Sequence, residues 1–587
     1  MVSSTLWRSA SNAGSFRAGE TMIEITLTGQ TLALRPHGYD EMSKLAIHRC
    51  VPCARWSRAA GAWRAPATHG ALGRIAHLIS SAPDFGVSLR VATNVELAIA
   101  ARARRPADDD SPLPFEAAGT PWRHQRCAHH FLRWARESTR GALLDCGMRT
   151  GKTRMVLEHL ASLAPELRRG LVVTPTSVVD VWPEQCEKHL RSGMLNVIAV
   201  EKGTVAKRIA RVIEILEDPE PGIAVIGWAV LERLTIEQKM SLRTALTGRT
   251  VVADEVHFAK AAGSSRSKAL SYISEFVAMR IGASGTPLAH SPLDAYGVFR
   301  FIDPGLWGES FISFRDEYAV MGGYGRHQVL GFRNLDDLAS RMAPYTFRAT
   351  RDVLELPAAQ HIDIPIHLPP HALAVYDQME RECIADLKSG TLLAANSLSK
   401  LMRLAQIASG YLPSASDPAA VEPLHDEKEA ALVDLFDSCD PTEPWVVFCR
   451  FHHDLDAGMR AATIAGRVAC EFSGRSKELD QWRAACRAGK GAVLVAQIQS
   501  GGIGISLVEA AYCAYISIGY SLAEWQQSLA RIHGPEQTRS VAYYHLIAKG
   551  TVDEDIREAL DKRADILSFV ARRLMHANAR SLEAANG

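Results

Sequence analysis

Short apolar runs rich in β-branched residues alternate with longer amphipathic stretches from about residue 115 onward. The runs GLVVTP, IAVIGW and TVVADE are each short enough for one buried strand, and the stretches between them place apolar residues at helical spacing. Strands that alternate with helices in this way are typical of parallel-sheet α/β domains.

The pattern changes twice further along the chain. It loosens into helix-rich sequence between about 356 and 440, and strand-like runs then return as PWVVFC, GAVLVAQ, YCAYISIG and VAYYHLIA. We therefore predict two tandem α/β lobes, over 115–355 and 356–572, with a helical insertion in the second lobe.

The sequence upstream of the first lobe has a different character. The strand-like IEITLT begins a segment that we interpret as a small α+β domain over 22–105, and PADDDSPLP (106–114) reads as a linker. Residues 1–21 are rich in Ser, Ala, Gly and Arg and have no apolar core, so we predict a disordered leader rather than a signal peptide. Residues 573–587 are predicted to be a frayed tail.

Composition narrows the class of protein. The 587 residues are 47% hydrophobic and carry a net charge of +1, so contacts with nucleic acid must come from local patches. The 11 cysteines have no disulfide-framework spacing, which favours a reducing cytoplasm. We find no apolar run of 18 residues and therefore expect no membrane span.

The stretch LLDCGMRTGKTRMVL resembles a phosphate-binding loop with displaced glycines. Gly151, Lys152 and Thr153 fit the pattern, but Cys146 occupies the first glycine position and Gly147 comes one residue late. The predicted strand-to-helix junction would offer backbone N–H groups and a helix dipole to a phosphate. Lys152 would reach the β- and γ-phosphates and the Thr153 hydroxyl would bind Mg²⁺. Taken alone, the stretch is equally compatible with an ordinary helix start.

A second candidate feature follows about a hundred residues later. The predicted strand TVVAD ends in Asp254, and Glu255 comes next. Carboxylates at the end of a buried strand are costly unless they bind something. Asp254 would hold Mg²⁺ through water and Glu255 would orient the water that attacks the γ-phosphate. The alternative is a solvated strand end, which the upstream loop disfavours.

These residues carry a resemblance to a known family. The run from Asp254 to His257 resembles the DEAH box of superfamily-two helicases, and FAKAAGSSRSKAL resembles the following segment in Swi/Snf DNA-dependent ATPases. Further resemblances to that family occur in family order, namely PWRHQRCAHHFL to the adenine-reading segment, IGASGTPLAHSPLDAYGVFRFIDPGLWG to motif III, FRATRDVLELP to the segment ending in Leu-Pro, QSGGIGISLVEAA to motif V and QQSLARIHGPEQ to motif VI. The similarity spans about 115–560 and implies two RecA-like lobes that use ATP and Mg²⁺.

The resemblance also implies roles for individual residues. The implied ATP contacts are Gln125, Met148, Gly151, Lys152, Thr153, Gly504 and Gln527. The implied catalytic groups are Lys152, Asp254, Glu255 and Arg531, and Thr153 and Asp254 would be the metal ligands. The residues implied to couple hydrolysis to movement are His257, Ser284, Gly285 and Thr286.

The chain departs from the family pattern at two positions. Arg149 stands where the family's phosphate loop has a glycine, in a place where backbone freedom is normally wanted. Gly534 stands where motif VI has its second arginine. Since an arginine finger can contribute about 10³ to 10⁵ in rate, this loss would slow turnover unless another side chain substitutes. Arg531 is the candidate for the remaining finger, and Arg539 lies nearby in sequence.

Nucleic-acid contacts are predicted in both lobes and in the N-terminal domain. Family-like contact positions in the lobes are Thr174, Ser177, Ser500 and Gly501. In the N-terminal domain Arg55, Trp56 and Trp63 interleave basic and aromatic side chains, which is a pattern that binds phosphates and stacks on bases. The same stretch is compatible with a small core of packed tryptophans, and it resembles the HARP domain of annealing helicases. Cys50 and Cys53 lack a second pair at zinc-finger spacing.

The favoured interpretation is an ATP-driven translocase of Swi/Snf type that moves on duplex or branched DNA. Two alternatives stay open: a nucleotide-responsive DNA clamp that hardly hydrolyses ATP, and a motor subunit for a separate nuclease in a defence complex. A grip on backbone phosphates would accept RNA as well as DNA. The compact size indicates a bacterial or bacteriophage protein with a role in DNA repair or remodelling.

Overall fold

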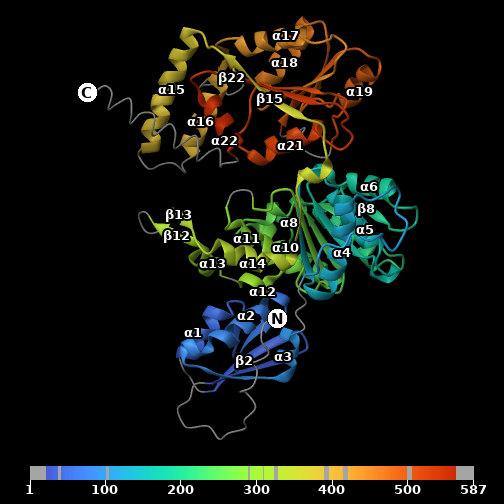
Figure 1. Cartoon of the computed structure of the whole chain (residues 1–587), viewed down its shortest axis with the longest axis vertical. Helices are drawn as coiled ribbons and strands as arrows, with labels where there is room; N and C mark the ends of the chain where they lie inside the picture. The colour runs from blue at the N-terminus through green and yellow to red at the C-terminus, as the bar shows by residue number, and fades with distance from the viewer. Residues whose placement is uncertain are drawn as a thin grey trace. The chain divides into compact units, whose positions relative to one another are not determined.

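A computed structural model describes residues 22–37, 41–100, 105–288, 291–308, 310–322, 328–388, 395–413, 421–498 and 505–562. The predictions for the leader, the tail, Ser500, Gly501 and Gly504 lie outside these residues. The chain divides into two compact units, Met1–Val353 and Leu354–Gly587 (Figure 1).

The first unit is built around a seven-stranded sheet in which every strand is parallel to its neighbours. Its order is β14-β6-β11-β10-β7-β9-β8. The strands are β6 (Gly141–Cys146), β7 (Gly170–Thr174), β8 (Val197–Ala199), β9 (Ile223–Gly227), β10 (Thr250–Asp254), β11 (Met279–Ser284) and β14 (Thr346–Ala349).

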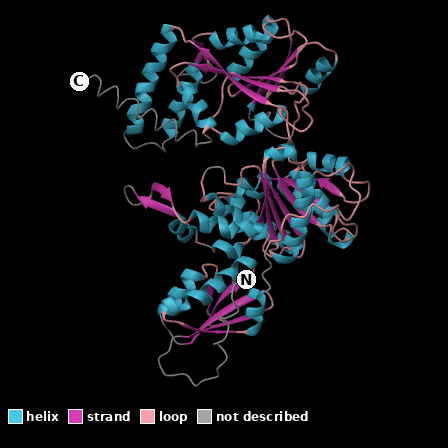
Figure 2. Cartoon of the chain, in the orientation of Figure 1, coloured by secondary structure: helices cyan, strands magenta, loops and turns pink. Residues whose placement is uncertain are grey.

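Both faces of this sheet are buried, which explains its continuous apolar strands. Leu143 and Val251 belong to one apolar cluster, whereas their neighbours Leu144 and Val252 belong to another. Because successive side chains of a strand point to opposite faces, the two clusters are two core layers, and helices cover each of them (Figure 2). The helices are α4 (Arg123–Ser138), α5 (Lys152–Ala161), α6 (Val181–His189), α7 (Val205–Glu217), α8 (Trp228–Glu232), α9 (Ile236–Ala245), α10 (Ser265–Ile273) and α11 (Asp294–Ile302).

Beyond α11 the chain forms an extension that the sequence pattern did not predict. It contains a two-stranded antiparallel hairpin whose exposed side chains include Val320, Leu330 and Phe332. The elements are α12 (Pro304–Trp307), α13 (Phe311–Tyr318), β12 (Ala319–Gly322), β13 (Gln328–Phe332) and α14 (Leu335–Met342).

A separate five-stranded sheet precedes this lobe in the same unit, in the order β3-β4-β2-β1-β5. Alternate residues such as Ile23, Ile25, Leu32 and Leu34 face a core formed with three helices, so the sheet is covered on one side. The elements are β1 (Met22–Thr28), β2 (Thr31–His37), α1 (Glu41–Cys50), β3 (Arg55–Ser57), β4 (Ala62–Pro66), α2 (His69–Ser81), β5 (Ser88–Val91) and α3 (Thr93–Ala100).

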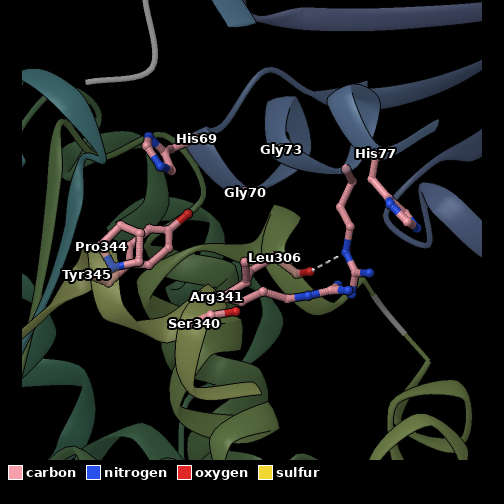
Figure 3. Close-up of a pocket in the computed structure, with 10 residues that line it drawn as sticks. His69, Gly70, Gly73, His77, Leu306, Ser340, Arg341, Pro344 and Tyr345 are labelled. Atoms are coloured by element: carbon pink, nitrogen blue, oxygen red, sulfur yellow. Dashed lines mark hydrogen bonds between the residues drawn. The ribbon is translucent and has the colours of Figure 1, made fainter. Parts of the chain in front are cut away.

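Helix α2 of this small domain packs against the lobe through a buried polar seam. The Asp303 carboxylate accepts hydrogen bonds from the Gly70 backbone N–H, at 2.9 Å, and from the Tyr345 hydroxyl. The Arg74 guanidinium, only 5% exposed, donates to the Leu306 carbonyl at 3.1 Å (Figure 3). A cavity of about 280 Å³ lies beside these bonds, and none of the predicted site residues line it.

Glycines permit the close approach of the two backbones at this seam. A Cβ at Gly70 would lie 2.8 Å from Leu306 Cα, and a Cβ at Gly308 would lie 2.6 Å from the Pro52 carbonyl. Neither position tolerates a side chain without movement of the backbone. The N-terminal domain is therefore packed against the lobe and is not held by its linker alone.

The second unit contains a six-stranded sheet of parallel strands in the order β15-β22-β21-β18-β20-β19. Its strands are β15 (Ala359–Ile366), β18 (Trp445–Cys449), β19 (Val468–Phe472), β20 (Ala492–Gln497), β21 (Tyr512–Tyr515) and β22 (Val541–Ala548). The other elements are α15 (Pro370–Lys388), α16 (Ala395–Ala408), the hairpin strands β16 (Tyr411–Pro413) and β17 (Val421–Pro423), α17 (Glu427–Asp437), α18 (His452–Ile464), α19 (Leu479–Arg487), α21 (Leu522–Ile532) and α22 (Val552–Asp561).

Strand β15 corrects the prediction that sequence after 356 is helix-rich from its start. It forms the edge of the sheet and pairs only with β22 among the described strands. Its residues AQHIDIPI alternate between polar and apolar, and most are exposed or half-buried. An edge strand of this kind lacks the continuous apolar run by which the central strands were predicted.

The predicted fold class is confirmed: an α/β chain with two tandem parallel-sheet lobes, helical insertions and a small α+β N-terminal region. The domain boundaries stay predictions. No helix among the described residues combines the length and the apolar character needed to cross a bilayer.

The seam makes a testable prediction about stability. Gly70→Ala should lower the free energy of unfolding of the first unit by about 1–3 kcal/mol, because the added methyl group overpacks against the Leu306 backbone. Gly263→Ala is the matched control, since a Cβ there meets nothing within 4 Å. Thermal unfolding of the full chain measures both, and equal midpoints for the two variants would contradict the prediction.

Candidate functional site

Four adjacent strands of the first unit end at one edge of the sheet. Cys146, Ser284, Asp254 and Thr174 are the last residues of β6, β11, β10 and β7, which are neighbours in that order. The carboxyl edge of a parallel sheet is where α/β proteins usually place their ligands. The predicted phosphate loop and the Asp-Glu pair are thereby brought together from positions about a hundred residues apart.

The phosphate loop runs from the end of β6 to the start of α5. Arg149 has a φ of 66° and Gly151 has a φ of 88°, so the loop contains two left-handed residues. Gly151 is also the N-cap of α5. A Cβ at this glycine would lie 2.4 Å from the Gln125 side-chain nitrogen, so the position requires glycine for space as well as for conformation.

Two buried side chains of α4 hold the second half of this loop. The Gln125 amide donates to the Thr150 carbonyl at 3.1 Å, and His124 Nε2 lies 2.8 Å from the same oxygen. The other end of the Gln125 amide accepts a bond from the Trp122 backbone N–H. In this structure the predicted adenine-reading glutamine therefore positions the loop.

Lys152 lies in the first turn of α5 and folds back over the loop. Its ammonium donates to the carbonyls of Cys146, at 3.0 Å, and Gly147, at 3.3 Å. Its positive charge favours the ionised forms of both Asp254 and Glu255, so it lies within electrostatic reach of the two carboxylates. The lysine thus links the loop to the acidic pair.

Asp254 is a buried carboxylate held by its neighbours. It accepts a hydrogen bond from the Thr174 hydroxyl at 2.9 Å and one from the Glu255 backbone N–H at 3.0 Å. Burial, followed by repulsion from Glu255, raises the pKa of Asp254 to about 6. A nearby cation would stabilise the ionised form of this carboxyl group.

Glu255 follows the strand in a left-handed conformation, with a φ of 50°. The Ser284 hydroxyl donates to its Oε2 at 3.2 Å, and His257 Nδ1 lies 3.2 Å from the same oxygen. Burial raises the pKa of Glu255, but the bond from His257 and the Lys152 charge outweigh it and hold the value below the usual range. Glu255 is therefore ionised at neutral pH and oriented by two side chains.

The remaining predicted residues of this lobe lie around the same edge. A Cβ at Gly285 would lie 3.4 Å from Met148 Cγ and 3.7 Å from Lys152 Nζ, so the motif III turn contacts the loop directly. The Thr286 backbone N–H donates to the Ser284 hydroxyl. Thr153 is partly exposed in the first turn of α5, and Ser177 is exposed after β7.

The side chain of Thr174 is completely buried, and its hydroxyl is committed to Asp254. Thr174 is the last residue of a central strand whose neighbour β10 ends in that carboxylate. Its side chain therefore supports the acidic pair, and a nucleic-acid contact by its backbone stays a prediction.

The motif VI residues belong to the second unit. Gln527 and Arg531 are four residues apart on α21 and therefore share a helix face. Arg531 Nη1 donates to the Ile505 carbonyl at 3.3 Å. Gly534 is buried, and a Cβ there would make only ordinary contacts, the nearest being Glu536 Oε2 at 3.5 Å.

Arg539 is not positioned to replace an arginine at 534. Its guanidinium pairs with Glu443 at 2.8 Å and donates to the Glu509 carbonyl at 3.0 Å. Glu443 lies just before β18, at the amino end of a strand, whereas ligand sites of parallel sheets lie at the carboxyl ends.

The basic and aromatic residues of the N-terminal domain separate onto two faces. Arg55 is paired with Arg64 across the β3–β4 hairpin, and Trp56 is paired with Trp63. Because alternate residues point to opposite sides, the arginines and the tryptophans do not form one surface. Trp63 packs edge-on against His48 with ring centroids 4.5 Å apart, while Trp56 is 50% exposed.

Sequence reasoning missed three supports of the site, namely His124, Thr174 as a partner of Asp254, and Arg351. A Cβ at Gly147 would lie 2.9 Å from Arg351 Cγ, so this arginine covers the first half of the loop. The available signals were local: His124 precedes the predicted glutamine, and Arg351 lies in the segment that resembles the family pattern ending in Leu-Pro.

Comparison with known proteins gives a family for this arrangement. Residues 124–410 match the SNF2-related domain. A phage protein, "Putative protein p41" of Acyrthosiphon pisum secondary endosymbiont phage 1, is 27% identical over 72% of this chain and 92% of its own length.

Two cellular relatives are longer proteins. An uncharacterized ATP-dependent helicase of Mycoplasma pneumoniae is 23% identical over 75% of this chain, and the DNA repair and recombination protein RAD54B of Mus musculus is 21% identical over 71%. The chain spans 41% and 52% of their respective lengths.

A solved structure, the Sulfolobus solfataricus SWI2/SNF2 ATPase core in complex with dsDNA, matches 76% of this chain and 92% of its own at 20% identity, with a TM-score of 0.37. The SNF2-related match and the helicase and RAD54B relatives agree with one another. The chain therefore contains, over residues 124–410, an SNF2-related domain of the kind found in superfamily-two ATPases.

Proposed function

We propose that this protein is an ATP-driven motor that translocates on, or remodels, duplex or branched DNA. The observation that carries the proposal is the convergence of Lys152, Asp254 and Glu255 at the carboxyl edge of one sheet. A cationic turn at a helix start beside one buried and one half-buried carboxylate suits the binding and hydrolysis of a triphosphate.

Glu255 would be the residue that acts on the attacking water. It is ionised, and His257 and Ser284 fix one of its oxygens, so the other oxygen is available to orient a water and accept its proton. Lys152 would leave the carbonyls of Cys146 and Gly147 for the β- and γ-phosphate oxygens. Ser284 connects this centre to the motif III turn, which would report the state of the nucleotide to the rest of the lobe.

The donor set fits Mg²⁺ bound together with ATP. Thr153 and Asp254 offer one hydroxyl and one carboxylate, and Mg²⁺ usually takes one or two carboxylates with phosphate oxygens and waters. The raised pKa of Asp254 indicates that its negative charge is only partly compensated. A divalent cation would supply the missing positive charge. When bound, Mg²⁺ would neutralise charge on the phosphates. Among the described residues no cluster of three or more His, Cys, Asp or Glu could hold a metal by itself.

The second lobe carries further residues with proposed roles in the reaction. The family resemblance of motif VI supports Arg531 as an arginine that stabilises the transition state, with Gln527 and Gly504 as further nucleotide contacts. Binding and hydrolysis of ATP would drive the steps of the protein along its track.

Several features support DNA as the track. RAD54B is described as a DNA repair and recombination protein, and one solved SWI2/SNF2 core is described as a complex with dsDNA. We propose backbone contacts by Ser177, Ser500 and Gly501. We also propose a HARP-like role for the N-terminal domain in recognising branched DNA, with Arg55 and the exposed Trp56 acting from opposite faces of the β3–β4 hairpin. An RNA track and a nuclease partner stay open. No disulfide links any of the eleven cysteines, all of which are described, and we place the protein in a reducing cytoplasm.

One observation favours a second candidate function, a DNA clamp that responds to nucleotide but hydrolyses it slowly. Gly534 removes one of the family's two arginines, and Arg149 introduces a side chain into the phosphate loop. The first change lies in a part that controls turnover, and the second lies in the loop that would bind the phosphates.

Hydrolysis assays separate the motor from the clamp. Duplex or forked DNA should stimulate phosphate release by the wild type, and Lys152→Ala and Glu255→Gln should each lower the stimulated rate by at least ~10²-fold, because each removes a group that acts in the transition state. Single-stranded DNA and RNA of equal length complete the panel and identify the track. Equal background rates for wild type and Lys152→Ala would establish the clamp and contradict the motor.

The protonation of Asp254 predicts a pH dependence. Only its ionised form binds Mg²⁺, so activity should fall as pH drops through about 6 at limiting Mg²⁺, and excess Mg²⁺ should move this midpoint to lower pH. Thr174→Val removes a hydrogen bond that favours the ionised form, so it should raise the midpoint by ~1 pH unit. Thr174→Ser keeps the hydroxyl and is the control. Superimposable acid limbs for the valine and serine variants would refute this role of Thr174.

A further inference from the structure

The chain's two departures from its family pattern are linked by charge. One removes an arginine, at Gly534, and the other adds one, at Arg149. We propose that Arg149 is a catalytic arginine that the phosphate loop supplies in cis, and that it provides the transition-state charge that position 534 does not. The proposal rests on the proposed hydrolysis of ATP at this loop.

The backbone of Arg149 is the first observation. Its φ of 66° is left-handed, a conformation that is less favourable for a residue with a Cβ than for glycine. Such conformations persist where surrounding contacts impose them, and they concentrate at functional sites. A glycine would avoid this cost, which makes the arginine side chain a candidate for a functional role.

The residues on both sides of Arg149 are fixed. Before it, the Gly147 N–H donates to the Ala349 carbonyl at 2.8 Å, and Met148 lies against Gly285. After it, the Thr150 carbonyl is held by His124 and Gln125, and the Thr150 hydroxyl donates to the Gly147 carbonyl.

These anchors have a consequence for the arginine between them. The course of the loop at Arg149 is set by neighbours on both sides, while Arg149 itself is partly exposed. The start of this side chain is thereby positioned within the turn whose N–H groups would cradle the phosphates.

The second unit does not supply an equivalent charge at position 534. The nearest side-chain atom to a Cβ there is a Glu536 carboxylate oxygen, at 3.5 Å, and Arg539 is paired with Glu443. The motif VI segment from 522 to 539 contains only two arginines, Arg531 and Arg539. One arginine of the family's pair is therefore missing, while the phosphate loop carries one more cation than the family pattern.

An arginine suits this task because its planar guanidinium binds phosphate oxygens with two donors at once and stays charged at every working pH. In the reaction the bond from the γ-phosphorus to the β–γ bridging oxygen breaks, and the bond to the water oxygen forms. The water proton passes to Glu255, and negative charge moves onto the leaving oxygen. Arg149 would stabilise that charge and would form no covalent bond.

Four variants of the full chain test the proposal. Arg149→Gly removes the charge and relieves the backbone, Arg149→Ala removes the charge alone, and Arg149→Lys keeps a charge without the two-donor geometry. The fourth, Arg149→Gly combined with Gly534→Arg, moves the arginine to its family position. The measurements are DNA-stimulated kcat, thermal midpoint, and affinity for ADP with and without tetrafluoroaluminate as a mimic of the transferring phosphoryl group.

The expected result separates catalysis from structure. Arg149→Gly and Arg149→Ala should lower kcat by about 10²- to 10³-fold, with ADP affinity unchanged and ADP–tetrafluoroaluminate affinity reduced by a similar factor. Arg149→Lys should lower kcat by a smaller factor, because the lysine keeps the positive charge. Arg149→Gly should be at least as heat-stable as the wild type, and adding Gly534→Arg should recover at least ~10-fold of its lost rate.

Other outcomes would overturn the proposal. A wild-type or higher kcat for Arg149→Gly would show that the arginine is merely tolerated. Equal losses of affinity for ADP and for its fluoride complex would show a role in loop structure, and no recovery with Gly534→Arg would refute the exchange between the two positions. A wild type no faster than Lys152→Ala would instead reject hydrolysis itself, and with it this inference.

Discussion

The structure of the site depends on the cost of placing two adjacent carboxylates inside a protein. Asp254 ends a fully buried strand and the half-buried Glu255 follows it, so water solvates the two carboxylates less than it would at a surface. Thr174, Ser284 and His257 supply hydrogen bonds, and Lys152 supplies the opposite charge. Each of these groups comes from a different strand end or loop, so the four central strands must keep their order for the pair to remain charged.

The two carboxylates are neighbours with different protonation behaviour. Asp254 receives less compensation and has a raised pKa, whereas Glu255 receives more and has a lowered one. Pairs of acids whose environments separate their pKa values commonly divide the work of a reaction. This difference supports the proposed division, in which Asp254 would hold the metal and Glu255 would orient the water.

The sequence was most informative where chemistry and local structure coincide. The loop around Lys152 and the strand that ends in Asp254 could be predicted, because buried parallel strands are apolar throughout and their ends are marked by polar residues. Edge strand β15 and the β12–β13 hairpin could not, since partly exposed strands lack that contrast. The role of Thr174 depends on which strand lies beside β7, and a single sequence contains no such pairing. The same holds for the bond between Gly70 and Asp303, whose partners are 233 positions apart.

The seam between α2 and the first lobe has a mechanical consequence. Because the backbones touch at Gly70 and Gly308, and because Arg74 and Asp303 are buried there, the small domain cannot swing freely on its connecting segment. Load applied to the small domain would pass from α2 into α12, from there into α11 and, where α11 packs on β11, into the strand that ends at Ser284. A force on the N-terminal domain would thus reach the sheet edge that carries Asp254 and Glu255.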